Sequence, residues 1–177
     1  DAESEALLPL QGSGLTFASI GNARREKGFA DILRAIDIFD ALGDAPGIHF
    51  LIQANFPDAS CAAALARFRR RDSVSLIEKS LNEDQYLQIL GRAHVVMLPY
   101  HLDIYAERSS GIFCEALGAG RPVLATKGCW ISDIVSSRGV GWLVPERDPT
   151  ALARGIEAAS RSYEAVEARA QAEAAGF

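Results

Sequence analysis

The chain has 177 residues, and at roughly 100–200 residues per domain this length fits one domain rather than two. Apolar residues make up 49% and charged residues 23%, which is typical of a soluble globular protein and excludes a disulfide scaffold, a disordered regulator and a fibrous protein. Lys and Arg number 18 against 23 Asp and Glu, and the net charge of −5 disfavours generic binding to nucleic acid or to an anionic membrane.

Segments suited to buried strands alternate with segments of helical periodicity along nearly the whole chain. The expected strands cover residues 15–20, 48–52, 73–77, 94–98, 122–126 and 140–144. The expected helices cover residues 29–42, 59–70, 82–93, 111–118, 132–137 and a segment that follows Asp148, with Asn82 and Asp148 as N-caps. Because the strands are short and rich in Val, Ile and Leu, this alternation predicts an α/β fold, a Rossmann-like doubly wound parallel sheet of about six strands with helices on both faces.

The same pattern divides the chain into three parts. Residues 1–14 are acidic and then rich in Gly and Ser, and we expect a linker or tail there. Residues 15–160 would form the domain, and residues 161–177, rich in Ala and Glu, would form a C-terminal helix. The thin apolar stripe of that helix, made by Tyr163, Val166 and Ala170, fits either packing on something outside this chain or a frayed end.

The cysteines and the N-terminus indicate where the protein works. Cys61, Cys114 and Cys129 are far apart and odd in number, which argues against a disulfide framework and favours a reducing compartment. The start of the chain lacks both Met and the basic region of a signal peptide, so we expect a piece of a longer protein. We expect a cytoplasmic location, with any peripheral attachment to the inner face of the membrane made through a missing domain.

In a doubly wound sheet, ligands bind at the carboxyl ends of the strands, so the loops there are the first candidates for a site. The loop from Gly21 to Gly28 brackets three cations with two glycines at the start of an expected helix. A helix N-terminus binds phosphate, Lys27 would add a point charge on a diphosphate, and Arg24 or Arg25 would add a bidentate contact. The alternative is a solvated basic turn. The dinucleotide and P-loop glycine patterns are absent, which disfavours a dehydrogenase.

A second segment pairs two carboxylates that lie eight positions apart. Glu107 is in the loop after the fourth expected strand, and Glu115 is in the first turns of the helix that follows. Between them Ser109, Ser110 and Gly111 offer hydroxyl and backbone N–H groups to an anion. Because Glu115 is on an otherwise apolar helix it needs a partner, and the vicinal hydroxyls of a ribose are a natural one. The alternative is a surface glutamate on a half-exposed helix.

These segments resemble the signature of the group 1 retaining glycosyltransferases, which have the GT-B fold. The family has Glu-x7-Glu, an Ala after the second Glu, a Gly-x-Pro-Val strand, a basic phosphate loop and a Gly-x-Gly-x-Leu-Val strand. The matching positions here are Glu107, Glu115, Ala116, Gly120 to Val123, Gly21 to Gly28 and Gly139 to Pro145. The resemblance covers residues 15–160 and implies the C-terminal, nucleotide-sugar-binding half of a two-domain enzyme.

The resemblance also implies roles for the matched residues. Glu115 would hold the ribose, Glu107 would contact the donor sugar, and Lys27 would neutralise the diphosphate and so stabilise the leaving group, which makes Glu107 and Lys27 the catalytic pair. The expected nucleotide and phosphate set is Asn22, Arg24, Arg25, Lys27, Ser109, Ser110, Gly111, Ile112 and Glu115. The base is expected near Lys79, Ser80 and Leu81, and the sugar pocket near His101, Asp103 and Arg108.

The sequence departs from the family pattern in two places. Asn22 stands where the phosphate loop usually has Arg, so that Arg24 or Arg25 would replace it from a shifted position, or phosphate binding would be weaker. Ser110 stands where the family places a glycine, which leaves Arg108 as an alternative phosphate ligand.

The expected function is to bind the donor in a retaining glycosyltransferase that moves a sugar from a nucleotide-diphosphate sugar to a glycan or lipid-linked acceptor, in polysaccharide biosynthesis. The acceptor site would lie mostly on a missing N-terminal domain, so the isolated chain would bind a nucleotide yet transfer poorly. We expect no cofactor, no metal ion and no nucleic-acid partner. The alternatives are a non-catalytic nucleotide-binding module of the same fold and half of a nucleotide-sugar epimerase.

Overall fold

The computed structural model describes residues 14–43 and 47–176, so the expected linker lies outside the described residues except for Gly14. Six parallel strands form one sheet in the order β3-β2-β1-β4-β5-β6. The strands are β1 (Leu15–Ser19), β2 (Ile48–Gln53), β3 (Val74–Ile77), β4 (Val95–Leu98), β5 (Val123–Thr126) and β6 (Gly141–Val144). The predicted fold class is confirmed.

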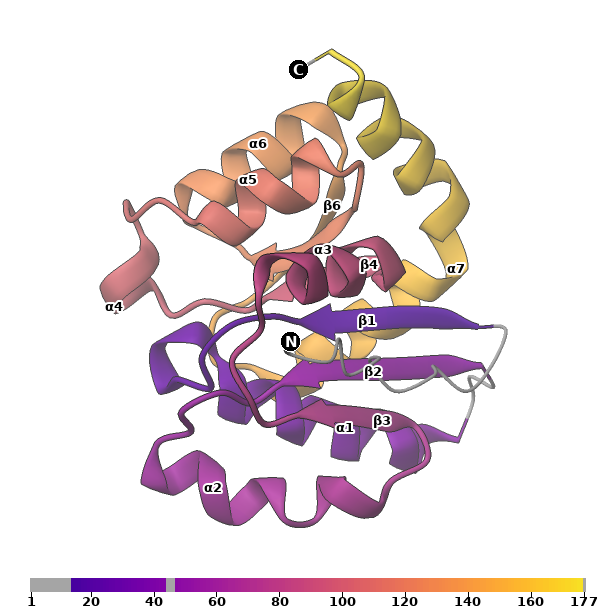
Figure 1. The fold of residues 1–177 in the computed structure, drawn as a ribbon. Helices are drawn as coiled ribbons and strands as arrows, with labels where there is room; N and C mark the ends of the chain where they lie inside the picture. Colours follow the sequence, from indigo (N-terminus) through magenta and orange to yellow (C-terminus); the bar gives the residue numbers. More distant parts are fainter. Residues whose placement is uncertain (1–13, 44–46, 177) are drawn as a thin grey trace.

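Helices cover both faces of the sheet (Figure 1). They are α1 (Phe29–Leu42), α2 (Ala59–Leu65), α3 (Glu83–Arg92), α4 (Leu102–Tyr105), α5 (Gly111–Gly118), α6 (Trp130–Arg138) and α7 (Pro149–Ala174), with 3-10 turns at Arg25–Lys27 and Phe68–Arg70. One hydrophobic layer joins the sheet to α1, α2 and the first half of α7, and the other joins it to α3, α5 and α6. Strand side chains alternate between the two layers, as Leu124 and Ala125 do on β5.

Two local predictions were wrong in detail. The helix expected over residues 59–70 ends at Leu65 and gives way to a 3-10 turn, in which Phe68 is fully buried. Arg71, just after that turn, pairs with Asp37 and Asp40 of α1, so the segment after α2 is tied to α1. The short helix α4, in the loop after β4, was not predicted.

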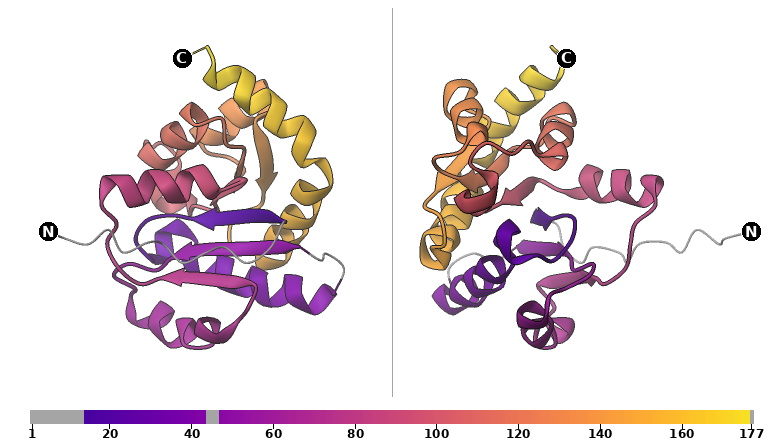
Figure 2. Two further views of the ribbon diagram at one scale, coloured as in Figure 1. Left: turned by 45° about the vertical axis from the view of Figure 1, so that its right-hand side comes forward. Right: turned by 90° about the vertical axis from the view of Figure 1, so that its left-hand side faces the viewer.

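The expected C-terminal helix is the continuation of the helix that Asp148 caps. The Asp148 carboxylate accepts from the Ala151 N–H at 2.9 Å, and the helix runs to Ala174 with one non-helical residue, Ser162. Its first half packs on α1 and its second half reaches α5 (Figure 2). The stripe of Tyr163, Val166 and Ala170 is buried within this chain. No helix among the described residues is long and apolar enough to cross a membrane.

The strand order reverses between the neighbouring strands β1 and β4. The loops that follow these two strands therefore lie against each other at the carboxyl edge of the sheet. Gly28, at the end of the β1 loop, has φ 69°, and a Cβ there would be 2.0 Å from the Pro99 carbonyl oxygen. The Glu26 carbonyl accepts from the His101 N–H at 2.9 Å. The basic loop is therefore held against the end of β4.

A comparison of alanine variants at Gly28 and Gly43 distinguishes the cost of a left-handed backbone from the cost of a steric clash. Both have left-handed φ, but a Cβ at Gly43 would meet no atom of the described residues within 4 Å. We expect Gly43→Ala to lower the free energy of unfolding by about 1 kcal/mol, and Gly28→Ala to lower it by roughly 3 kcal/mol or more. Urea denaturation of the two variants checks this. Equal losses would show that Pro99 does not restrict Gly28.

Candidate functional site

In the loop after β1, Gly21 lies close to the Lys27 ammonium and to the first turn of α5. Gly21 has φ 111° and its N–H donates to the Gln53 amide oxygen at 2.7 Å. A Cβ on Gly21 would lie 2.8 Å from the Lys27 ammonium nitrogen and 3.3 Å from Cδ1 of Ile112, in the first turn of α5. The structure thus brings together two segments that are about 90 positions apart in the sequence.

Three cations gather around this point. Burial lowers the pKa of Lys27 below its ordinary value, and the positive charges of Arg24 and Arg108 lower it further, while Glu26 partly offsets them. Arg24 is 3.7 Å from Glu26, and the Arg108 guanidinium lies over the Tyr105 ring at 5.6 Å. A partly buried ammonium beside two exposed guanidinium groups favours an anion of multiple charge, such as a diphosphate.

The start of α5 is held by a buried serine. Ser110 caps the helix, since its hydroxyl accepts from the Phe113 N–H at 3.2 Å and shares a hydrogen bond with the Tyr100 hydroxyl at 3.2 Å. Among the described residues, the N–H groups of Gly111 and Ile112 have no acceptor, as expected in the first turn of a helix. The Ser110 hydroxyl is therefore part of the fold, while these N–H groups and the exposed Ser109 are open to a ligand.

An open groove of about 420 Å³ lies between α3 and α5. Its lining consists of Leu81, Asn82, Glu83, Tyr86, Gly111, Ile112 and Glu115. The Tyr86 hydroxyl donates to one carboxylate oxygen of Glu115. Burial, together with the Glu115 carboxylate, raises the pKa of Tyr86, so this phenol stays a donor at physiological pH. Sequence reasoning missed Tyr86, because only the packing of α3 on α5 shows that it faces Glu115.

The residues expected around the base divide into two groups. Leu81 lines the groove beside Glu115. Lys79 and Ser80 are instead tied to the strand ends, because the Gln53 amide donates to the Lys79 carbonyl at 3.3 Å and the Asn55 amide donates to the Ser80 hydroxyl at 3.1 Å. Asn22, expected to bind phosphate, forms a β-bridge with Asn55. Gln53 and Asn55, which sequence reasoning did not select, thus connect the loops after β1, β2 and β3.

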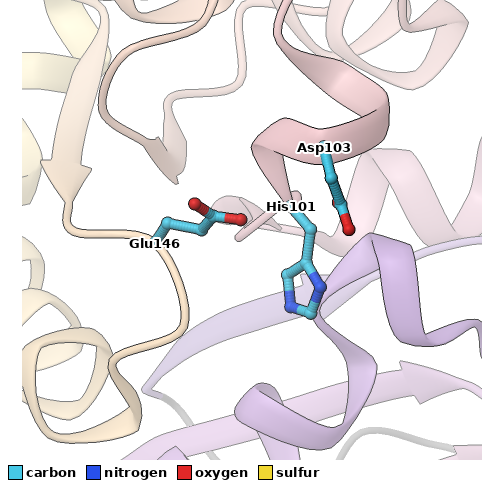
Figure 3. Close-up of side chains that lie close together, drawn as sticks. All are labelled: His101, Asp103 and Glu146. Atoms are coloured by element: carbon cyan, nitrogen blue, oxygen red, sulfur yellow. The ribbon is translucent and has the colours of Figure 1, made fainter.

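His101 and Asp103, expected in the sugar pocket, lie in the segment that begins α4. The His101 ring is buried and bonds to Asp31 of α1 at 2.9 Å through Nε2. His101, Asp103 and Glu146 offer ligand atoms within 4.8 Å of one another (Figure 3). Arg147 already pairs with Asp103 at 2.8 Å and with Glu146 at 3.3 Å, so a cation would have to displace its guanidinium. These contacts brace α4 against α1 and the loop after β6.

The remaining predicted residues lie in the 3-10 turn after β1 and in the segment between α4 and α5. Glu107 is exposed, and within the described part of the chain its carboxylate has no hydrogen-bond or ion-pair partner. The backbone of Arg108 is fixed, since its carbonyl accepts from the Trp130 indole at 2.7 Å. Arg25 is exposed on the 3-10 turn.

The buried cap at Ser110 gives a stability test. We expect Ser110→Ala to lower the free energy of unfolding by about 1–2 kcal/mol or more, because it removes the cap and leaves the buried Tyr100 hydroxyl without its partner. The matched control, Ser109→Ala in the exposed neighbour, should change it by less than about 0.5 kcal/mol. Thermal or urea denaturation measures both. A neutral Ser110→Ala would mean that the hydroxyl does not hold the start of α5.

Comparison with known proteins places this arrangement in a family. A profile of the family described as Glycosyl transferases group 1 matches residues 14–162. The probable glycosyltransferase WbjE of Pseudomonas aeruginosa is 28% identical over 150 residues, which cover 80% of this chain and 34% of WbjE. The chain therefore spans about a third of the length of this curated relative.

Solved structures share the fold at low identity. The C-terminal domain of a group 1 glycosyl transferase (LpcC) from Francisella tularensis superposes with a TM-score of 0.70 at 15% identity, over 90% of this chain and 82% of that one. Anabaena Alr3699/HepE, solved in complex with UDP-glucose, superposes with a TM-score of 0.70 at 13% identity, over 92% of this chain and 43% of that one. The chain belongs to the group 1 glycosyl transferases and has the fold of the C-terminal domain of a GT-B enzyme.

Proposed function

We propose that this domain binds the nucleotide-diphosphate sugar for a retaining glycosyltransferase. The observation that carries the proposal is the packing around Gly21, where the Lys27 ammonium and the first turn of α5 flank a bare backbone. Glu115 lies in the adjoining groove, one helical turn from the unpaired N–H groups of Gly111 and Ile112. A diphosphate at Gly21 and a ribose at Glu115 are adjacent parts of one nucleotide, so one ligand fits both features.

In this proposal each group acts on a defined part of the donor. The N–H groups of Gly111 and Ile112 hold a phosphate, and Lys27, with Arg24 and Arg108 near it, offsets the charge that grows on the diphosphate as the glycosidic bond breaks. These cations would offset the negative charge of the leaving diphosphate, as a bound metal ion does in other enzymes. The exposed carboxylate of Glu107, which has no partner in the described part of the chain, is available to the hydroxyls of the donor sugar. Glu115, oriented by Tyr86, accepts from the ribose hydroxyls.

The rest of the enzyme would supply the acceptor. We propose a glycan or lipid-linked acceptor held by an N-terminal domain, in polysaccharide biosynthesis. The family match supports a transferase. This chain covers only 34% of WbjE and 43% of HepE, which supports a second domain in the whole protein. Anabaena HepE, which was solved with UDP-glucose bound, supports a nucleotide-sugar donor.

Glu115→Ala tests the ribose contact. Because Glu115 is exposed, we expect little change in the free energy of unfolding, while affinity for the best-bound nucleoside diphosphate falls about tenfold to a hundredfold through loss of a charged hydrogen-bond acceptor. Isothermal titration calorimetry with GDP, UDP and ADP measures the affinity. Glu164→Ala, an exposed glutamate on α7, is the control. A destabilised variant that binds normally would rule out the ribose contact.

Lys27→Ala tests the diphosphate contact. We expect the variant to lose at least about tenfold in affinity for the diphosphate and to bind the matching nucleoside as the wild type does. Because the pKa of Lys27 is lowered, wild-type affinity should fall with rising pH earlier than an ordinary lysine would allow, and the variant should lose this step. Titration calorimetry at a series of alkaline pH values measures both effects. Equal weakening of nucleoside and diphosphate would remove Lys27 from the phosphate site.

A further inference from the structure

The groove between α3 and α5 contains a second carboxylate that the proposed function does not use. Glu83 is exposed in the first turn of α3 and lines the groove together with Tyr86 and Glu115. Among the described residues it has no hydrogen-bond or ion-pair partner. The turn that holds it is fixed, because Asn82 and Gln85 form a capping box with hydrogen bonds of 2.8 and 3.2 Å. A carboxylate on a fixed backbone, unpartnered among the described residues and lining a groove, can accept from a ligand with hydrogen-bond donors.

The place of Glu83 in the groove suits a nucleotide base. Glu83 precedes Tyr86 by three residues, so the two share a face of α3 about 4.5 Å apart along its axis. Tyr86 contacts Glu115, which marks the ribose end of the groove. The groove also offers the apolar side chains of Leu81 and Ile112 to the faces of a flat ring. A base joined to a ribose at Glu115 would therefore present an edge to Glu83.

A carboxylate at that edge distinguishes the bases. Guanine carries two adjacent donors, N1–H and the N2 amine, which match the two oxygens of a carboxylate in a bidentate contact. Uracil presents a single N–H between two carbonyl oxygens, and adenine and cytosine place a ring-nitrogen acceptor beside their amine. Building on the proposed function, we propose that Glu83 recognises guanine and that the donor is a guanosine-diphosphate sugar.

Four nucleotides and two variants test this proposal. Calorimetry with GDP, IDP, UDP and ADP should show that the wild-type chain binds GDP at least about tenfold more tightly than the other three, since IDP lacks only the N2 amine. Glu83→Gln puts an amide donor against the guanine donors, and it should lower GDP affinity about tenfold or more and bring GDP and IDP close together. Asp84→Asn makes the same charge change at the next residue, outside the groove, and should keep the wild-type order.

The outcomes separate this inference from the proposed function. Comparable binding of UDP or ADP, or an unchanged preference for GDP over IDP in Glu83→Gln, would overturn the role of Glu83 while leaving a nucleotide site in place. Failure of all four diphosphates to bind the wild-type chain would overturn both. Thermal denaturation of Glu83→Gln and Asp84→Asn confirms that each variant is folded before its affinity is interpreted.

Discussion

The close approach of Gly28 to the Pro99 carbonyl is the constraint on which the candidate site depends. It brings the loop after β1 against the end of β4 at the point where the strand order reverses, with no room for a side chain between them. The Glu26–His101 backbone bond and the His101–Asp31 contact fasten the same two segments. Lys27 precedes this contact, and the segment after Pro99 leads through α4 to α5. The relative positions of the cation and the helix start are thus set by backbone packing.

Two tyrosines that pack in the hydrophobic layer orient polar side chains of the candidate site through hydrogen bonds. Tyr100 is buried and holds the capping Ser110, and its burial raises the pKa of the phenol to about 12. Tyr86, on α3, holds the Glu115 carboxylate by donating a hydrogen bond from its hydroxyl. Both phenols remain protonated at physiological pH, so Tyr86 stays a donor to Glu115, while in the Tyr100–Ser110 pair either hydroxyl can donate. A carboxylate on an exposed helix would otherwise sample several rotamers, and fixing it beforehand reduces the entropy lost on binding.

The sequence predicted the fold well wherever local signals sufficed. The strands, the N-caps Asn82 and Asp148 and the boundaries of α1 follow from periodicity and capping chemistry, whereas the capping role of Ser110 was not predicted. Leu81, Ile112 and Glu115, which the family resemblance assigns to one nucleotide, line the same groove, and their binding roles stay predictions. Tyr86, Gln53 and Asn55 were missed because their partners come from other elements, and neither propensity nor spacing contains that information. The end of α2 and the short α4 were missed for the same reason, since the contacts nearby, such as Arg71–Asp37 and Arg147–Asp103, are made to other parts of the chain.

The central claim is that one nucleotide diphosphate spans the Gly21 loop and the groove between α3 and α5. The most direct measurement is a ¹⁵N-NMR titration of the chain with the nucleoside diphosphate that it binds best. The account predicts saturable shifts of the amides of Gly21, Lys27, Tyr86, Ile112 and Glu115, which line this path. Shifts confined instead to the apolar pocket between α5 and α6, around Phe113 and Trp130, or an unchanged spectrum, would contradict it.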